Sequence, residues 1–154
     1  MQPVLYDTSV YISALRQQRT GVFAARRTGA NVLLWLSAVV LQELYAGADE
    51  QARIAIEKLE HDFDKAKRIL VPNLGDWTQA GKILSRFTTK YDYEQLGRAR
   101  LTNDALIAMS AGRVGIRVIT GNERDFRRLA ELRAFQWESL ISNFDHRRKI
   151  LLAL

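Results

Sequence analysis

The sequence predicts an α/β fold in three layers, in which helices flank a central parallel sheet of four or five strands. Short apolar runs rich in Val, Leu and Ile alternate with longer segments of helical periodicity. Strands separated by helices pair in parallel through crossover connections. Only 2 prolines and 9 glycines punctuate the 154 residues, which favours helices over hairpins. The length and the 47% of hydrophobic residues predict one globular domain over residues 1–154.

The expected strands are short and buried. The chain enters an apolar run at once, and similar runs rich in Val, Leu and Ile follow at intervals. A further run near the C-terminus is a candidate fifth strand at the edge of the sheet. In chain order, the expected strands are residues 3–6, 32–36, 69–71, 118–120 and 134–137.

Helices are expected in the segments between these strands. In residues 38–48, the spacing of Val39, Val40 and Leu44 defines an inward apolar face. Residues 102–114 are apolar nearly all round, which predicts a buried helix. In chain order, the expected helices are residues 8–17, 38–48, 51–67, 75–89, 102–114 and 123–131.

The chain is basic. Its 23 Lys and Arg residues outnumber 17 Asp and Glu residues, which gives a net charge of +6, and 17 of the 23 cations are Arg. Arg matches phosphate groups bidentately, so this balance favours a nucleic acid or another polyanion as partner. An ordinary solvated basic surface would give the same numbers, and charge alone does not separate the two.

Several other classes of protein are excluded or disfavoured. With no Cys, the chain has no disulfide, no thiolate nucleophile and no Cys-ligated zinc. It has no Gly-x-Ser-x-Gly elbow and no Gly-rich phosphate loop. His61 and His146 lie among charged residues, which is typical of a surface. The longest uncharged stretch, residues 28–42, is too short to span a bilayer, and we expect a cytoplasmic protein without membrane contact.

Four carboxylates stand where apolar residues are expected. Asp7 closes the first strand, Glu43 shares a helical face with Val39 and Val40, and Asp104 and Asp125 lie on apolar helix faces. A buried ionised carboxylate costs several kcal/mol unless it is paired or bound to a metal. Carboxylates that share a site also repel one another. A hard divalent ion such as Mg²⁺ or Mn²⁺ relieves both costs.

Each of these acids also has an ordinary structural explanation. Asp7 could cap the first helix, and Asp104 could interact with a helix dipole. Asp125 could pair with Arg128, and Glu43 could pair with an Arg that faces the core. Taken singly, each explanation is plausible, and only the convergence of all four acids at one edge of a sheet favours a shared site.

Four segments that carry these acids resemble, in order and spacing, the four motifs of PIN-domain nucleases. They are Asp7-Thr8-Ser9, residues 39–47 around Glu43, residues 103–108 around Asp104, and residues 120–126. The length of the chain is most similar to that of VapC-type toxins of prokaryotic toxin–antitoxin pairs. The resemblance implies a PIN-like parallel sheet and a ribonuclease that depends on Mg²⁺ or Mn²⁺.

The resemblance also implies a set of site residues. Asp7, Glu43 and Asp104 fall on the three principal acidic positions, and all four acids, Asp125 included, are candidate catalytic residues and metal ligands. Family members often carry an acid at the place of Asn122, so Asp125, Glu123 or Asn122 could fill the fourth position. Ser9 and Thr120 match supporting polar positions, as does Asn122. The candidate RNA-binding residues are Arg16, Arg19, Arg26, Arg98, Arg100 and Arg124.

The expected reaction is hydrolysis of RNA, with Glu43 orienting or deprotonating the attacking water and a 5′-phosphate and 3′-hydroxyl as products. A homodimer and a cognate antitoxin are the partners that the resemblance implies. Residues 52–63 either contribute to such an interface or form an ordinary core face. The alternatives are a non-catalytic PIN-like RNA-binding or interaction module and a DNA-directed flap-type nuclease. No motif names the RNA that is cut.

Overall fold

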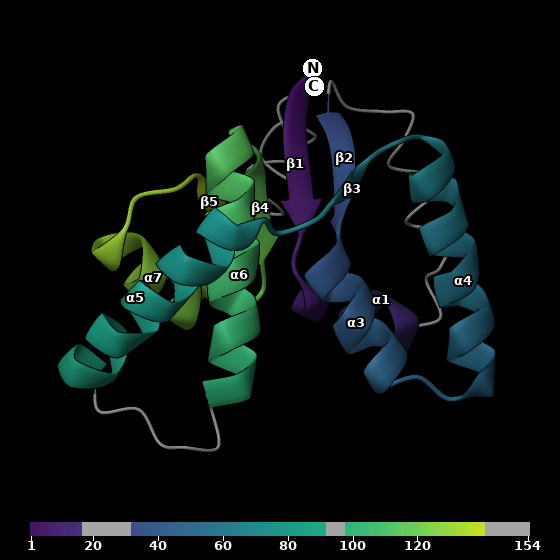
Figure 1. Ribbon diagram of the computed structural model, residues 1–154. Coiled ribbons are helices and arrows are strands. Elements are labelled where there is room, and N and C mark those ends of the chain that lie inside the picture. The colour runs from purple at the N-terminus through teal and green to yellow at the C-terminus, as the bar shows by residue number, and fades with distance from the viewer. Residues whose placement is uncertain (17–31, 92–97, 141–154) are drawn as a thin grey trace, which may run out of the picture.

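Five strands in the described part of the chain form one parallel sheet, which confirms the predicted α/β architecture. The structure is a computed structural model that describes residues 1–16, 32–91 and 98–140 (Figure 1). The order across the sheet is β3-β2-β1-β4-β5. Central β1 pairs on both sides, with Val4 opposite Leu34 and Leu5 opposite Val118. The strands are β1 (Gln2–Tyr6), β2 (Val32–Ser37), β3 (Ile69–Leu70), β4 (Arg117–Thr120) and β5 (Trp137–Ser139).

The helices form two groups. Helices α1, α3 and α4 contact one another in turn, and α5, α6 and α7 pack together. In Figure 1 the first group lies on the right and the second on the left. No helix among the described residues has the length and apolar character needed to cross a membrane. The helices are α1 (Thr8–Arg16), α3 (Ala38–Ala46), α4 (Glu50–Lys65), α5 (Leu74–Tyr91), α6 (Arg98–Val114) and α7 (Glu123–Leu132).

The order of the strands explains this division. From β1 the chain moves through β2 to β3 at one edge, and it then crosses to β4 and continues to β5 at the other edge. Because parallel crossovers are right-handed, the reversal puts the two helix groups on opposite faces of the sheet. The strand order therefore reverses its direction between β1 and β4. In open α/β sheets, ligands bind beyond the carboxyl ends of the strands at this switch point.

The core lies between the sheet and both helix groups. As predicted, α6 is buried on nearly all sides in its middle, where Ala105, Leu106, Ile107 and Ala108 are almost inaccessible to solvent. On the other face, Val40 of α3 is fully buried. Strands covered on both faces in this way are expected to be apolar where they are buried, as Val4, Leu5 and Tyr6 of β1 and Val118 and Ile119 of β4 are.

The predicted fifth strand was misplaced. We expected it at residues 134–137, but β5 spans Trp137–Ser139. Gln136 still accepts a hydrogen bond from the Val118 amide, while Phe135 packs its ring edge-on against Phe126 at 6.2 Å between centroids. The apolar character that suggested a strand therefore belongs to a segment that packs its side chain on α7 before strand pairing begins.

The apolar residues of α4 mostly face the core. Ile56 and Phe63 are buried, and Leu59 packs against the core from a partly buried position. Ile54 alone of the four apolar residues singled out in 52–63 is well exposed, at 70%. The ordinary alternative, a core face, therefore accounts for three of these four residues.

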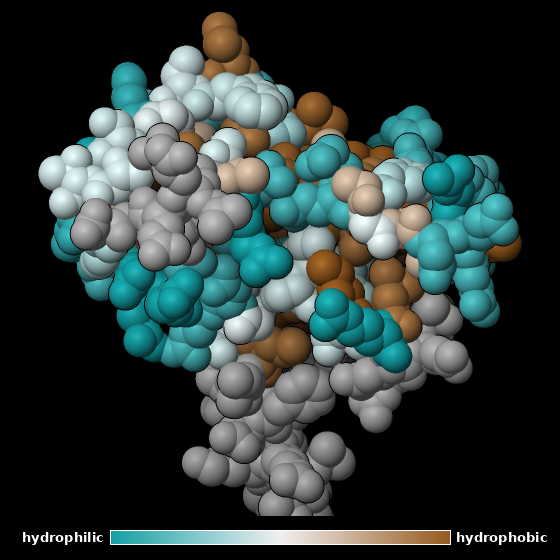
Figure 2. All heavy atoms as spheres, turned by 90° about the horizontal axis from the view of Figure 1, so that it is seen from below, coloured by the Kyte–Doolittle hydropathy of each residue, from teal (hydrophilic) through white to brown (hydrophobic). Residues whose placement is uncertain are grey.

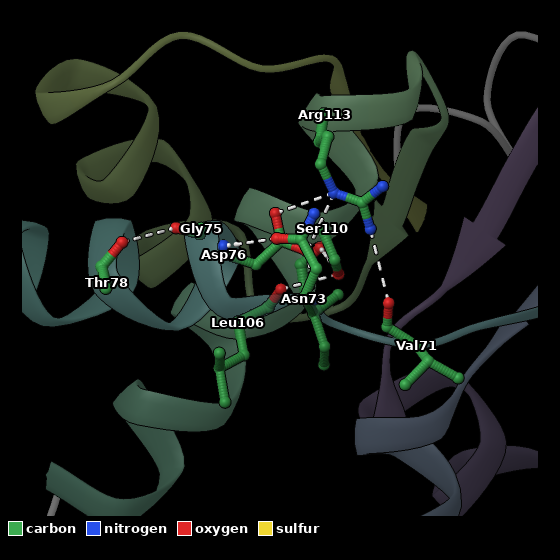
Figure 3. A network of polar contacts seen from close by, with 9 residues as sticks. Val71, Asn73, Gly75, Asp76, Thr78, Leu106, Ser110 and Arg113 are labelled. Atoms are coloured by element: carbon green, nitrogen blue, oxygen red, sulfur yellow. Dashed lines mark hydrogen bonds and ion pairs between the residues drawn. The ribbon is translucent and has the colours of Figure 1, made fainter.

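Helix α5 begins with a reciprocal cap (Figure 3). The Asp76 amide donates to Asn73 Oδ1, and the Asn73 amide donates to Asp76 Oδ2, each at 2.9 Å. This is a capping box, in which the two side chains satisfy amides that the first helical turn leaves free. Asp76 is buried and also accepts from Arg113 Nε at 3.0 Å, and Arg113 Nη2 donates to the Val71 carbonyl. Through its pair with Arg113, Asp76 thus joins the start of α5 to the end of α6.

Replacing Asn73 by Ala is expected to lower the free energy of unfolding by about 1 kcal/mol, because the Asp76 amide loses its acceptor. Urea unfolding followed by circular dichroism measures the change. Asn73→Ser keeps a good capping oxygen and should lose less than half as much. Equal losses for the two variants would contradict the capping role.

Candidate active site

The candidate site lies at the carboxyl ends of β1 and β4. A cavity of about 830 Å³ opens there, and its walls come from the segment after β1 and from α1, α3, α6 and α7. Figure 2 looks onto this end of the molecule and shows hydrophilic side chains on both sides of a recess. Asp7, Glu43, Asp104 and Asp125 all line the cavity, although they are distant along the chain. Its other polar lining residues are Thr8, Ser9, Ser13, Arg16, Gln42, Arg100, Asn122 and Arg124.

Asp7 is almost completely buried. It directly follows β1, and its amide donates to the Ile119 carbonyl at 3.1 Å, which continues the pairing with β4. Its carboxylate accepts from Ser9 Oγ on Oδ1 and from Thr120 Oγ1 on Oδ2, each at 2.6 Å. Both carboxylate oxygens are thus bound by hydroxyls, and the carboxylate also accepts from the Val10 amide, so Asp7 caps the first turn of α1 as its alternative supposed.

The hydroxyls that bind Asp7 are themselves fixed by backbone. Thr120 Oγ1 accepts from the Asn122 amide at 2.8 Å, and Ser9 Oγ accepts from the Gly121 amide at 3.0 Å. A Cβ at residue 121 would lie 3.1 Å from Ser9 Oγ, so the close approach of the two loops suits glycine. These contacts join the turn after β4 to the start of α1.

Glu43 extends from α3 toward the same cavity. Thr8 Oγ1 donates to Glu43 Oε2, and Asn103 Nδ2 donates to Oε1 at 2.9 Å. Among the described residues, Glu43 forms no ion pair with an Arg, which was its structural alternative. Thr8 and Asn103 received no role from the sequence, because their contacts join helices 35 and 60 residues apart along the chain.

Asn122 bridges the other two acids. Its Nδ2 donates to Asp104 Oδ2 at 3.1 Å and to Asp125 Oδ2 at 3.0 Å. Asp125 also pairs with Arg124 Nε at 3.2 Å, whereas Arg128 lies over the Tyr91 ring. Asp104 is not in the first turn of α6, so it does not serve the helix dipole as the alternative supposed. Glu123 pairs with Arg127 and does not line the cavity.

The site has an excess of buried negative charge. Asp7, Asp104 and Asp125 are only 2%, 6% and 3% exposed, respectively. Burial raises the pKa of Asp7, and the charge of Glu43 adds to the effect. Burial also raises the pKa of Asp104 well above its usual value, with further contributions from Asp7, Glu43 and Asp125. Of the four acids, Asp125 alone has an ion-pair partner among the described residues.

The chemistry of this donor set fits a hard divalent cation. Oxygen ligands, burial and mutual repulsion are what Mg²⁺ or Mn²⁺ would satisfy and relieve. In the described ranges, however, no three Asp, Glu, His or Cys side chains converge closely enough to hold one ion as they stand. Their oxygens are engaged instead by hydroxyl and amide donors, so binding would require some of these hydrogen bonds to be exchanged.

The predicted arginines divide into two sets. Arg16, Arg100 and Arg124 line the cavity. Arg98 is the first residue of α6, and its side chain lies outside the described part of the structure. Arg19 and Arg26 also lie outside the described residues, as do His146 and residues 150–154. His61 is exposed on α4, as its charged sequence surroundings predicted.

Comparisons with known proteins agree with the observed fold. Solved structures with the same fold include DNA-bound VapBC from Salmonella typhimurium (TM-score 0.63, 20% identity, covering 90% of this chain and 98% of that chain). VapBC2 from Rickettsia felis, bound to a promoter DNA fragment, has TM-score 0.62 and 18% identity over the same shares. VapBC-1 from nontypeable Haemophilus influenzae has TM-score 0.57 and 22% identity, again over the same shares. No curated protein sequence matches the chain. The PIN domain family matches residues 4–132, and this chain therefore belongs to the PIN domain family.

Proposed function

We propose that this protein is a Mg²⁺- or Mn²⁺-dependent endoribonuclease and the toxin of a VapBC-type toxin–antitoxin pair. The observation that carries the proposal is the convergence of four carboxylates, three of them buried, on one cavity with a single ion-pair partner among them. Membership of the PIN family and the likeness to VapBC structures support it.

Each residue has a proposed role. Asp7 and Asp104 would hold the ion, with Asp125 completing the set directly or through water. When bound, a divalent ion supplies Lewis-acid chemistry that activates water and stabilises charge on the scissile phosphate. Glu43 would orient or deprotonate the attacking water. Ser9, Thr120 and Asn122 fix the aspartates through the hydrogen bonds described above.

The arginines at the cavity mouth would attract the substrate, because an acidic pocket by itself repels RNA. Replacing Arg16 and Arg100 by Gln is expected to raise KM about 5–10-fold and to flatten its salt dependence, by about 0.7 in log–log slope for each phosphate that no longer pairs with an Arg. Cleavage rates between 50 and 300 mM KCl measure both effects. Lys82→Gln, an exposed charge on α5 away from the cavity, is the matched control. An unchanged salt slope in the double variant would contradict a role of these arginines in RNA binding.

A homodimer and a cognate antitoxin are part of the proposal. The similar structures are described as VapBC complexes, some bound to DNA, which supports an antitoxin as partner. Sedimentation of the purified protein tests the dimer, and a monomer at micromolar concentration would contradict it.

A non-catalytic RNA-binding or interaction module is the second candidate. It is favoured by the hydrogen bonds that already engage the carboxylates and by the absence of three converging ligands in the described residues. Such a module would bind RNA without cutting it.

Incubation with total RNA in the presence of Mg²⁺ or Mn²⁺, followed by mapping of new 5′ ends, separates the two candidates. We expect discrete 5′-phosphate ends that disappear in EDTA and in the Asp7→Asn variant. The same ends from Asp7→Asn would exclude the proposed site. RNA binding without new ends, and without a Mn²⁺-induced rise in melting temperature, would favour the module.

A further inference from the structure

Both oxygens of the Glu43 carboxylate are bound by neutral donors from two helices. Thr8, the first residue of α1, donates to Oε2, and Asn103 of α6 donates to Oε1 at 2.9 Å. Helices α1 and α6 belong to the two groups that cover opposite faces of the sheet. Glu43 on α3 therefore lies where the two groups meet, and its orientation depends on both.

Stronger partners for Glu43 stand in the same cavity. Arg16 and Arg100 line it together with Glu43, and a guanidinium forms charge-assisted, bidentate pairs with carboxylates that are stronger than neutral hydrogen bonds. Arg100 lies three residues before Asn103 on α6, so the two side chains occupy one side of the helix. Nevertheless, Glu43 pairs with neither Arg in the described structure.

The consequence is that the charge of Glu43 remains available to the buried aspartates. Glu43, Asp7 and Asp104 line the same cavity, so this charge acts on the two aspartates across it. An ion pair with Arg100 would neutralise this charge. A nearby donor that fixes a ligating or base carboxylate commonly changes metal affinity or activity 10–100-fold when it is removed.

We infer that Asn103 is a positioning residue, which holds Glu43 toward Asp7 and Asp104 and keeps it from pairing with Arg100. The inference rests on the proposed function, because positioning Glu43 matters only if the carboxylates form a working site. Asn103 acts through Glu43 and needs no contact with RNA.

The contact itself is tested without metal or substrate. Urea unfolding of the metal-free wild type, Asn103→Leu, Glu43→Ala and the double variant forms a thermodynamic cycle. Leu has the same branched shape as Asn, although it is larger, and it cannot donate. We expect the unfolding equilibrium constants to be coupled by about 3-fold or more. Additive effects of the two substitutions would overturn the inference whether or not the protein cuts RNA.

The positioning role is tested by Mn²⁺ calorimetry and steady-state cleavage. Asn103→Leu should weaken Mn²⁺ binding and lower kcat, each by about 10-fold, with KM for RNA within about 2-fold. Asn103→Gln keeps an amide donor, so its Mn²⁺ affinity and its kcat should each reach at least about a third of the wild-type values. Gln51→Leu makes the same chemical change on an exposed part of α4 and should alter neither.

Competition by Arg100 gives the sharpest result. Adding Arg100→Gln to Asn103→Leu should raise Mn²⁺ affinity and kcat about 3-fold or more, whereas Arg100→Gln alone should raise neither. No recovery in the double variant would overturn the competition with Arg100. If the wild type binds Mn²⁺ and cuts RNA and Asn103→Leu does both equally well, Asn103 has no positioning role. If the wild type does neither, the proposed function itself fails.

Discussion

Replacing Asp104 by Asn is expected to abolish cleavage and, at the same time, to stabilise the metal-free protein. Asp104 is buried, its pKa is raised by burial and by the charges of the other three acids, and the donor to its carboxylate is the neutral amide of Asn122. Losing several kcal/mol of transition-state stabilisation corresponds to a fall in kcat of about 10³-fold. Asn keeps the shape and can still accept from Asn122, but it removes a buried charge. The metal-free melting temperature should rise by about 3–6 °C at pH 7.5.

A second buried aspartate provides the matched control. Asp76 is 3% exposed, like the site aspartates, but it is neutralised by Arg113 and accepts the Asn73 amide. Asp76→Asn should therefore lower the melting temperature by about 2–4 °C and leave cleavage within about 2-fold. Calorimetry in EDTA and a cleavage assay in Mg²⁺ measure both variants. A loss of stability in Asp104→Asn comparable to that in Asp76→Asn would show that Asp104 is a structural residue.

The contrast between these two residues shows why a carboxylate site differs from a structural ion pair. Both aspartates are on helices, and both are buried. The difference lies in the partner, which is a guanidinium for Asp76 and an amide for Asp104. A site that binds a cation must keep its charge unneutralised until the cation arrives, at a cost in stability.

The sequence predicts those site residues that stand out within a single helix or strand, and it misses those whose contacts join distant elements. Glu43 and Asp104 were conspicuous because helical periodicity put them with apolar neighbours, and Asp7 because it ends a strand. All four predicted acids line one cavity, and their roles stay predictions. Thr8 and Asn103 could not be found in this way, because nothing in a single helix distinguishes a hydroxyl or amide that meets a carboxylate on another helix.

The fold was predictable for a similar reason. Apolar runs and helical periods give the order of elements, and the helices between successive strands give the parallel sheet. The edge strand was misplaced because Phe135 is apolar for packing against Phe126 rather than for pairing. Arg124 lines the cavity, and its expected role at the RNA stays a prediction; its Nε also pairs with Asp125, a contact that a charge count does not reveal.

The metal-free protein is expected to lose stability as the pH rises from 5 to 8, and Mg²⁺ is expected to remove most of that loss. The pKa values of Asp7 and Asp104 are raised in the folded state, so the folded protein holds protons that the unfolded chain has released. Stability then falls with pH, because the folded state binds more protons than the unfolded state. The contribution of these two groups is fully present below their unfolded pKa, near 4, and is lost as the pH passes through the raised values.

Melting temperatures from pH 5 to 8, in EDTA and in 10 mM Mg²⁺, measure this coupling. Burying an ionised carboxylate costs several kcal/mol, and 1 kcal/mol corresponds to about 2–4 °C in a domain of this size. The fall in EDTA should thus reach about 5 °C or more. Other titrating groups add their own slope, although the lowered pKa of Glu131 acts below its usual value of 4.5 and so outside this range. The Asp104→Asn variant retains these other groups. Subtracting its melting curve against pH from that of the wild type therefore leaves the contribution of Asp104. If the difference between wild type and Asp104→Asn is independent of pH, or if Mg²⁺ leaves the wild-type slope unchanged, the four carboxylates do not form a shared cation site.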